Sequence, residues 1–168
     1  MHLRTAEPGD VRVIAQIHAR AWQEGYKGLM PEAFLACRSL SYRTEYWEMR
    51  IAEPNLAVIV CEQESVVTGW LEYGPSEGAA AAPDTGEIKA LNVDPGRWGQ
   101  GAGSALCAAA CSRLSDAGFR QVVLWVLLGN HRGRAFYEHI GFEQDVRVRD
   151  QFQAGEAVIP ELLYRRAL

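Results

Sequence analysis

The run VDPGRWGQGAGSAL, residues 93–106, decides how the rest of the chain is interpreted. It starts at the end of an apolar segment and continues through the turn-forming pair Pro95-Gly96. Three alternate glycines, Gly99, Gly101 and Gly103, then lead into a helical pattern. Glycine lets backbone N–H groups approach an anion closely, and the N-terminus of a helix adds positive potential. The run therefore predicts a diphosphate site between a strand and a helix.

Two nucleotide-binding folds also carry glycine-rich loops, and the sequence argues against both. A P-loop needs a Gly-Lys-Ser or Gly-Lys-Thr triplet, whereas residues 93–106 contain no lysine. A Rossmann fingerprint follows the first strand and places an acidic residue ~20 residues further on, at the end of a strand. Asp116 lies near that distance, but at the end of a helical pattern. Phosphoryl transfer is disfavoured as well, because the chain has no acidic cluster that would bind Mg²⁺.

A second informative run is NHRGRAFYEHIGF, residues 130–142. Asn130 suits the N-cap of a helix that Gly141 ends. The two runs together, in this order, resemble the GNAT superfamily of N-acetyltransferases. Its members have a glycine-rich loop after a strand that ends Val-x-Pro, followed by the pattern N-x-x-A-x-x-F-Y-x-x-x-G-F. Here Ala135 comes five residues after Asn130, two later than in that pattern, at a point where the family spacing varies. The element order agrees with the family over nearly the whole chain.

The segments around the two runs alternate between strand and helix patterns. Strands are expected at His2–Thr5, Leu56–Cys61, Val66–Tyr73, Glu87–Val93, Gln121–Leu128, Phe142–Arg149 and Ala157–Arg165. Helical patterns cover residues 11–24, 31–37, 41–52, 101–116 and 131–139, and Pro54-Asn55 ends the third of them. These patterns predict an α/β fold, α+β by some schemes, with helices on both faces of a mixed sheet. The resemblance implies about seven mostly antiparallel strands, with central parallel strands that splay apart.

Length and composition limit what the chain can do. Its 168 residues suit one domain, 1–168, with 48% hydrophobic and 23% charged residues. The longest apolar run, Val122–Leu128, is far shorter than the ~20 residues of a membrane span, and no signal peptide is expected. A net charge of −4 argues against nucleic acid as the partner. We expect a cytoplasmic monomer or homodimer that contacts neither membranes nor nucleic acid.

The four cysteines do not predict a metal site. Cys107 and Cys111 share a face of one helical pattern, but no third or fourth ligand is spaced to complete a zinc site around them. Cys37 and Cys61 belong to no C-x-x-C pair. Small buried thiols in a reducing compartment are the simpler interpretation. We therefore expect no metal.

The resemblance implies that acetyl-CoA is the acetyl donor, and it assigns binding residues position by position. The diphosphate would be held mainly by backbone amides of Gly99, Gln100, Gly101, Ala102, Gly103 and Ser104. The pantetheine arm would pair with the exposed strand edge at Leu91, Asn92 and Val93. A backbone N–H of the same edge would polarise the thioester carbonyl, as in an oxyanion hole.

Side chains near the two runs add further candidates for coenzyme binding. Asn130 would bind the pantetheine arm, or simply cap its helix. Arg132 and Arg134 could reach the phosphates of the coenzyme, or be solvated. Trp98 stands where the family often has arginine or glutamine, and Arg97, one residue earlier, could supply the cation.

Transfer to an amine also needs a base, because an ammonium group with a pKa of ~10 must lose its proton before it can attack. Glu87 matches the glutamate that many family members use, directly or through water. Glu24, Glu72 and His18 are weaker candidates. Tyr137 matches the family tyrosine that approaches the coenzyme sulfur, where it would protonate or orient the departing thiolate.

The sequence leaves the acceptor open. Trp22, Tyr26 and Tyr73 are aromatic candidates for its pocket, although they could equally belong to the core. Similar N-terminal segments occur in the bacterial subgroup that includes ribosomal-protein-alanine acetyltransferases. A peptide N-terminus, a polyamine, an antibiotic or an amino acid would fit.

The resemblance implies an N-acetyltransferase that works by direct transfer from acetyl-CoA to a primary amine in a ternary complex. The alternative is a non-catalytic sensor or assembly domain that binds acyl-CoA. Because the chain has both Tyr137 and Glu87, an enzyme is favoured.

Overall fold

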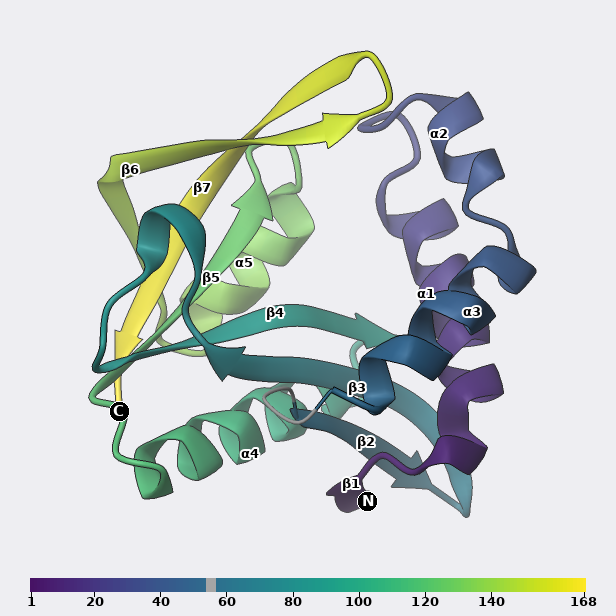
Figure 1. Cartoon of the computed structure of the whole chain (residues 1–168), viewed down its shortest axis with the longest axis horizontal. Helices are drawn as coiled ribbons and strands as arrows, with labels where there is room; N and C mark the ends of the chain where they lie inside the picture. The colour runs from purple at the N-terminus through teal and green to yellow at the C-terminus, as the bar shows by residue number, and fades with distance from the viewer. Residues whose placement is uncertain (54–56) are drawn as a thin grey trace.

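A mixed sheet with the strand order β1-β2-β3-β4-β5-β7-β6 runs through the protein (Figure 1). The computed structural model describes residues 1–53 and 57–168, with side chains at all of them except 147–149. The strands are β1 (His2–Thr5), β2 (Ala57–Gln63), β3 (Val66–Pro75), β4 (Thr85–Val93), β5 (Gln121–Leu127), β6 (Glu143–Ala154) and β7 (Ala157–Ala167). Strands β4 and β5 pair in parallel, and the other neighbours pair antiparallel. The prediction of a mostly antiparallel mixed sheet is confirmed.

Helices cover both faces of this sheet. They are α1 (Val11–Gly25), α2 (Glu32–Cys37), α3 (Leu40–Ile51), α4 (Ala102–Asp116) and α5 (His131–His139). Figure 1 shows α4 beneath strands β2 to β4, while α1 and α3 lie against the opposite face. Helix α4 connects the parallel neighbours β4 and β5, whereas α5 leads from β5 to β6, which is separated from β5 by β7.

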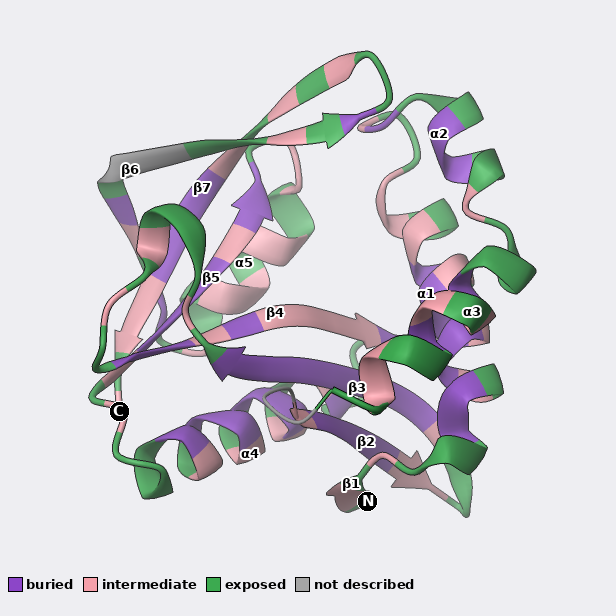
Figure 2. Ribbon diagram, in the orientation of Figure 1, coloured by how far each residue is buried: buried purple, intermediate pink, exposed green. Residues whose placement is uncertain are grey.

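Each layer has its own apolar core. Between α4 and the sheet, Leu106 and Leu114 of the helix pack in one cluster with Leu71 of β3 and Leu124 of β5. On the other face, α1 and α3 pack on the sheet through a second cluster that includes Trp47. Strand β3, which lies between these two layers, is buried along most of its length (Figure 2). Both helices present one apolar face to the sheet, as the helical spacing of their sequences predicts.

A third apolar cluster joins α2 to the tip of the β6–β7 hairpin. Phe34 and Leu35 of α2 pack with Ala154, and Ala157 at the start of β7 contacts the same cluster. Figure 1 shows the hairpin tip beside α2, although the two segments are far apart in the sequence. The hairpin and the N-terminal helices therefore meet beside the end of β5, whose Leu127 belongs to the same cluster.

The sequence underestimated the lengths of the last two strands. β7 continues to Ala167, which pairs with Gln121 of β5. β6 continues to Ala154, because it pairs with β7 from Glu143↔Arg165 to Ala154↔Ala157. This pairing keeps the polar segment 150–153 extended, which its composition does not predict. The predicted helix end at Pro54-Asn55 and the predicted strand start at Leu56 lie outside the described residues.

Candidate active site

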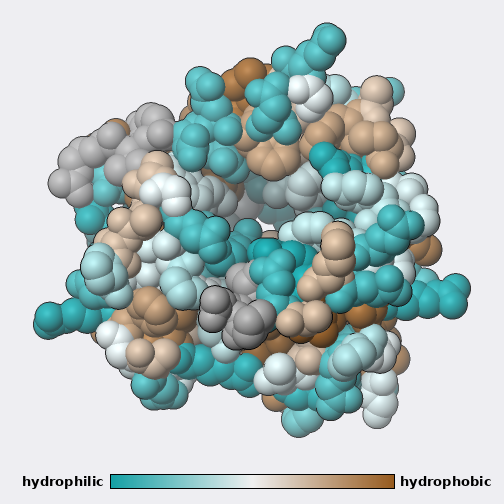
Figure 3. All heavy atoms as spheres, in the orientation of Figure 1, coloured by the Kyte–Doolittle hydropathy of each residue, from teal (hydrophilic) through white to brown (hydrophobic). Residues whose placement is uncertain are grey.

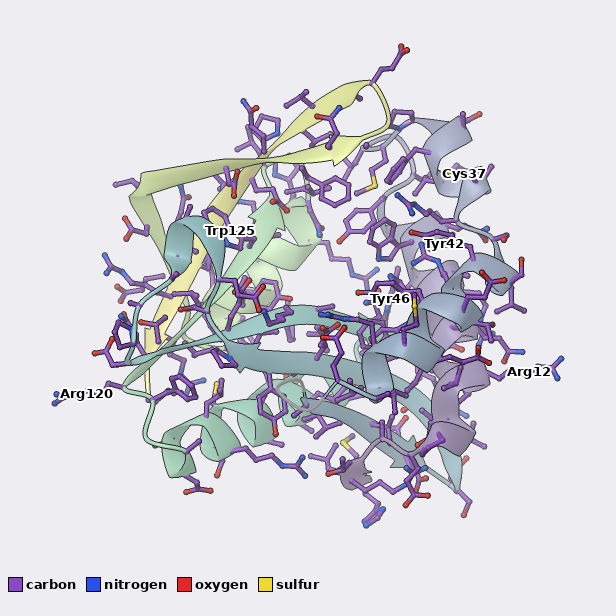
Figure 4. All side chains as sticks on the ribbon, in the orientation of Figure 1. Arg12, Cys37, Tyr42, Tyr46, Arg120 and Trp125 are labelled. Carbon is purple, nitrogen blue, oxygen red and sulfur yellow. The ribbon has the colours of Figure 1, made fainter. Side chains whose placement is uncertain are left out.

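A cavity of about 1010 Å³ lies between the N-terminal helices and the carboxyl ends of β4 and β5. One wall comes from α1, α2 and α3, and the other from β4, β5 and the starts of α4 and α5. Figure 3 shows the corresponding face hollowed between the β6–β7 hairpin and the lower part of the molecule. In Figure 4, Tyr46 of α3 and Trp125 of β5 lie on opposite sides of this space, and both line the cavity.

The cavity exists because β4 and β5 separate. Their parallel pairing is confined, among the described residues, to Thr85↔Gln121, Gly86↔Val122 and Glu87↔Val123. Beyond Glu87, the edge of β4 that faces β5 has backbone groups without a strand partner. A bulge against β3 follows at once, because Glu72 pairs with Ala90 and the next residue of β3 pairs with Ile88. An extended ligand could add to this free edge as a short strand would.

The glycine-rich loop meets the cavity at the start of α4. Gly101 is the N-cap in a left-handed conformation with φ +86°, and Gly99 has φ +77°. The first hydrogen bond of the helix runs from Ala105 N–H to Gly101 O at 3.0 Å, so the N–H groups before Ala105 are not used within the helix. A Cβ at Gly103 would lie 3.2 Å from Cζ of Phe136, so a larger residue there would require the Phe136 ring to shift. The loop has the geometry of an anion site.

Trp98 has a role that the sequence did not reveal. Its indole Nε1–H donates to the backbone oxygen of Val93 at 2.8 Å, which fixes the ring at the end of β4. The guanidinium carbon of Arg132 lies 3.7 Å from the centroid of the Trp98 ring. Such a contact stabilises a cation. Trp98 therefore holds Arg132 over the cavity, where Arg97 is also a lining residue.

Two of the residues predicted to bind the coenzyme, Gln100 and Arg134, do not line the cavity. The amide of Gln100 donates to the backbone oxygen of Gly96 at 3.4 Å, and Gln100 does not line the cavity. Arg134 donates to the Tyr164 hydroxyl at 3.2 Å and to the Leu128 backbone oxygen at 3.3 Å, also outside the cavity lining. The arginine of α5 that faces the cavity is Arg132. The other predicted coenzyme residues line the cavity, namely Leu91, Asn92, Val93, Arg97, Gly99, Gly101, Ala102, Gly103, Ser104 and Asn130.

Asn130 and Tyr137 mark the α5 side of the cavity. The Oδ1 atom of Asn130 accepts a hydrogen bond from the Gly133 N–H at 2.9 Å, so this residue caps the helix and leaves its amide N–H₂ group to donate. The Tyr137 ring packs edge-on against Phe136 and Phe142. Burial raises the pKa of Tyr137 well above its usual value, and nearby Cys107 contributes. Tyr137 is therefore a neutral hydrogen-bond donor.

Three carboxylates of the cavity, Glu72, Glu87 and Glu161, have raised pKa values. Glu87 accepts a hydrogen bond from the Glu77 N–H at 3.1 Å, and burial is the main cause of its raised pKa. Burial raises the pKa of Glu161 to about 7, and the negative charges of Asp150 and Glu87 add to the effect. Glu161 lies on β7, opposite Leu127 of β5. No sequence motif marks it, because its importance depends on strands that are distant in the chain.

The weaker base candidates are otherwise engaged. Glu72 is buried and forms an ion pair with Arg50. The Nδ1 atom of His18 accepts a hydrogen bond from Trp47 Nε1–H at 3.1 Å, and burial lowers the pKa of His18 well below its usual value. His18 is therefore neutral, with its acceptor nitrogen occupied. Glu24 is exposed and does not line the cavity.

The three aromatic candidates for the acceptor pocket separate into two groups. Trp22 and Tyr26 line the cavity, with their rings edge-on and their centroids 5.2 Å apart. Tyr73 does not line it: it is buried in the core under α4 together with Leu71. Because side chains alternate along β3, the neighbouring Glu72 is the residue that faces the cavity.

Within residues 1–53 and 57–168, no helix has the length and apolar character needed to cross a membrane. In the same part of the chain, no group of three or more His, Cys, Asp or Glu side chains is arranged for a metal ion. Burial raises the pKa of the Cys107 thiol to about 12 and also raises that of Cys111.

Comparison with known sequences identifies relatives of the chain. It is 30% identical to the Bacillus subtilis "uncharacterized N-acetyltransferase YuaI" over 131 residues, which cover 76% of this chain and 72% of that protein. It is 39% identical to a mycothiol acetyltransferase of Kocuria rhizophila over 75 residues. That match covers 45% of this chain, but 24% of the Kocuria protein.

Comparison with solved structures supports the fold. The PaiA N-acetyltransferase of Thermoplasma acidophilum, solved in complex with coenzyme A, superposes with a TM-score of 0.81 at 16% identity, covering 99% of this chain and 98% of that one. A ribosomal-protein-alanine N-acetyltransferase of Brucella melitensis superposes with a TM-score of 0.74 at 20% identity over the full length of both chains. The sequence model of the acetyltransferase (GNAT) family matches residues 14–142. With most of its length matched, this chain belongs to the acetyltransferase (GNAT) family.

Proposed function

We propose that this protein transfers the acetyl group of acetyl-CoA directly to a primary amine. One observation carries the proposal: β4 and β5 part after Glu87↔Val123, next to the glycine-rich start of α4. This combination offers a free strand edge for an extended thioester arm and N–H groups for the diphosphate at its end. Membership of the acetyltransferase (GNAT) family supports it.

The residues present fit the donor along its length. The N–H groups of Gly101 to Ser104 would bind the diphosphate, with Arg97 and Arg132 supplying positive charge. The arm would lie along Leu91 to Val93, and the free amide of Asn130 would donate to it. A backbone N–H of the same strand edge would stabilise the oxyanion that forms at the thioester carbonyl.

The reaction needs one nucleophilic attack and two proton movements. The neutral amine nitrogen attacks the thioester carbonyl carbon, and a tetrahedral oxyanion forms. The carbon–sulfur bond then breaks, which gives the amide and the coenzyme thiolate. The nitrogen loses its proton to a carboxylate of the cavity, and the Tyr137 hydroxyl donates a hydrogen bond or its proton to the thiolate.

We assign the base role to Glu87 together with Glu161. Both carboxylates line the cavity, and the charge of Glu87 is one cause of the raised pKa of Glu161. The charge of Glu87 therefore makes Glu161 hold its proton at a higher pH than it would beside a neutral neighbour. When the pair is fully ionised, it is a stronger base than an isolated carboxylate, and its pKa lies near neutral pH, where a general base works best.

Direct transfer is favoured over an acetyl-enzyme intermediate. Among the described residues, no cysteine lines the cavity. Cys107 and Cys111 are buried in the core, and their raised pKa values keep them protonated and poorly nucleophilic at neutral pH. The amine would therefore attack the bound thioester itself.

Two sets of relatives suggest different classes of amine as the acceptor. The shared fold with a ribosomal-protein-alanine N-acetyltransferase supports a peptide N-terminus. The sequence relatives named mycothiol acetyltransferase support a small thiol-related amine, although this chain spans about a quarter of the length of the Kocuria protein. We favour a small molecule, because α2 and the β6–β7 hairpin pack together on the acceptor side of the cavity through the lining residues Phe34 and Phe152.

A coupled thiol-release assay tests the proposal. The purified protein, acetyl-CoA and a panel of amines, including amino acids, polyamines, an aminoglycoside and alanine-initiated peptides, should release coenzyme A thiol with at least one acceptor. Mass spectrometry should then find that acceptor heavier by one acetyl group. Tight binding of acetyl-CoA without thiol release for any acceptor would instead support the non-catalytic acyl-CoA-binding alternative.

A further inference from the structure

Arg43 of α3 is a buried cation in the wall of the cavity. Its side chain lines the cavity, and the residue is 3% exposed. The guanidinium carbon lies 4.6 Å from the centroid of the Trp22 ring. Its Nε atom has no hydrogen-bond partner within the described part of the chain. A buried guanidinium normally has hydrogen-bonding partners, so Arg43 is an exception that needs an explanation.

Two other cations of the cavity, Arg50 and Lys89, are neutralised by carboxylates of the protein itself. Arg50 forms ion pairs with Glu72 and Glu53, and Lys89 pairs with Glu77 at 2.6 Å. Arg43 forms no such ion pair within residues 1–53 and 57–168. The protein therefore supplies a carboxylate for each of these neighbours and leaves the charge of Arg43 open to the cavity.

Arg38 adds a second positive charge beside Arg43. Its guanidinium carbon lies 4.8 Å from the Phe34 ring centroid and 4.6 Å from that of Tyr42, and it donates to the Tyr42 hydroxyl. Arg38 lines the same cavity. Burial, followed by the charge of Arg38, lowers the pKa of Arg43 to about 10, so Arg43 is still protonated at neutral pH. Two like charges at one place favour an anion between them.

We propose that the acceptor carries an anionic group, a carboxylate or a phosphate, close to the amine that is acetylated, and that Arg43, assisted by Arg38, binds this group. The inference rests on the proposed function and narrows its substrate class to a small zwitterionic amine. A guanidinium presents a planar fork of donors that matches either anion.

The arrangement of charges in the cavity fits such a molecule. Tyr26 lies within the influence of both Arg43 and Glu161, since each of these charges acts on its pKa. An acceptor over Tyr26 could thus direct its amine towards the carboxylates Glu161 and Glu87 and its anionic group towards Arg43. The cluster formed by α2 and the β6–β7 hairpin limits the space above this position, which suits a small acceptor.

Matched acceptor pairs test the proposal on the wild-type enzyme. The pairs are leucine with 3-methylbutylamine, phenylalanine with phenethylamine, and O-phosphoethanolamine with ethanolamine; in each pair the first member adds the anionic group. Initial rates are compared at equal concentrations of the neutral amine form, so that differences in amine pKa cancel. We expect kcat/KM to be higher by about tenfold or more for the anionic member of the preferred pair. The first two pairs report on a carboxylate and the third on a phosphate.

Substitution of Arg43 separates recognition from packing. Arg43→Met keeps a long apolar side chain over Trp22 and removes the charge, while Arg43→Lys keeps the charge and loses the fork. For the anionic acceptor, Arg43→Met should raise KM by about 10- to 100-fold with a small change in kcat, and Arg43→Lys should recover part of this loss. For the uncharged partner amine, KM should change less than about twofold. Arg12→Met, on the exposed face of α1, is the matched control.

A binding measurement keeps this test independent of turnover. Calorimetry on the protein loaded with coenzyme A compares N-acetyl-leucine with N-(3-methylbutyl)acetamide, N-acetyl-phenylalanine with N-phenethylacetamide, and N-acetyl-O-phosphoethanolamine with N-acetylethanolamine. The anionic member should bind more tightly, and Arg43→Met should remove that difference. Anion binding that depends on Arg43 without any thiol release would uphold the anion site and refute the proposed function.

Three results would overturn the inference. The first is equal use of both members of every pair by the wild-type enzyme. The second is an Arg43→Met variant in which both members lose the same factor, which would assign Arg43 to packing against Trp22. The third is the absence of Arg43-dependent binding for every anionic probe. If Arg43→Met fails to fold, as judged by circular dichroism and coenzyme A affinity, the wild-type comparison decides.

Discussion

The carboxylate pair of the cavity makes a quantitative prediction about pH. Burial and the charges of Asp150 and Glu87 raise the pKa of Glu161 to about 7. With that pKa, Glu161 is about 9% ionised at pH 6 and about 91% at pH 8, a ratio of about ten. Because the fully ionised pair is the stronger base, this contribution to the rate should fall about tenfold as the pH drops from 8 to 6.

Replacing Glu161 by glutamine removes this dependence. In Glu161→Gln the group with a pKa of about 7 is removed, while burial, the main cause that raises the pKa of Glu87, is unchanged. The plateau rate should fall, since an isolated carboxylate is the weaker base. The ratio of variant to wild-type kcat/KM should rise about tenfold between pH 8 and pH 6. The ratio is the useful quantity, because ionisation of the amine acceptor is common to both enzymes and cancels.

The companion variant is Glu87→Gln, and the control is Glu48→Gln on the exposed surface of α3. Glu87→Gln removes a negative charge that raises the pKa of Glu161. The acid limb of the pH–rate profile of this variant should therefore also move to lower pH. The control should follow the wild-type profile. Steady-state rates from pH 5.5 to 9 at several acceptor concentrations provide the measurement. A Glu161→Gln variant that keeps an acid limb near pH 7 would refute the assignment of the pair.

Two further predictions concern the donor. Gly101→Val places a β-branched residue at φ +86°, which costs roughly 1–2 kcal/mol or more and puts methyl groups beside the N–H groups at the start of α4. Calorimetry should find that the affinity for coenzyme A is lowered about tenfold or more. The control is Gly9→Ala, which has open space around the new methyl group and should leave this affinity unchanged. Unchanged affinity in a folded Gly101→Val variant would remove the diphosphate from this loop. Tyr137→Phe keeps the ring packed against Phe142 and removes the hydroxyl; it should lower kcat by about 100-fold or less without weakening coenzyme binding, and an unchanged kcat would exclude Tyr137 from assisting the thiolate.

Much of the donor side could be predicted from the sequence, because it depends on local chemistry. The glycines of residues 99–103, the cap at Asn130 and the ring at Tyr137 belong to two continuous runs. Positive φ angles at Gly99 and Gly101, and the hydrogen bond from Gly133 N–H to Asn130, follow from the residue types at those positions. The order of strands and helices followed from periodicity, and the family from the two runs together.

On the donor side, the sequence did not predict which arginine of α5 faces the cavity. Arg132 and Arg134 are two residues apart on α5, and the sequence does not distinguish them. In the structure Trp98 attracts Arg132 over its ring, while Tyr164 of β7 engages Arg134. Both partners come from other elements, so the difference between the two arginines is a tertiary effect.

On the acceptor side, the sequence determined which residues exist and the tertiary structure decided which of them meet. Alternation along β3 puts Tyr73 and Glu72 on opposite faces, but only the packing of α4 and α1 on those faces makes one the core and the other the cavity. Glu161 owes its raised pKa to burial and to Glu87 and Asp150, which two other strands bring beside it. Arg43 is unusual because folding buries it over Trp22 without a carboxylate partner among the described residues. Charge, burial and pairing are properties of the space around a side chain, and that space forms only when distant segments pack together.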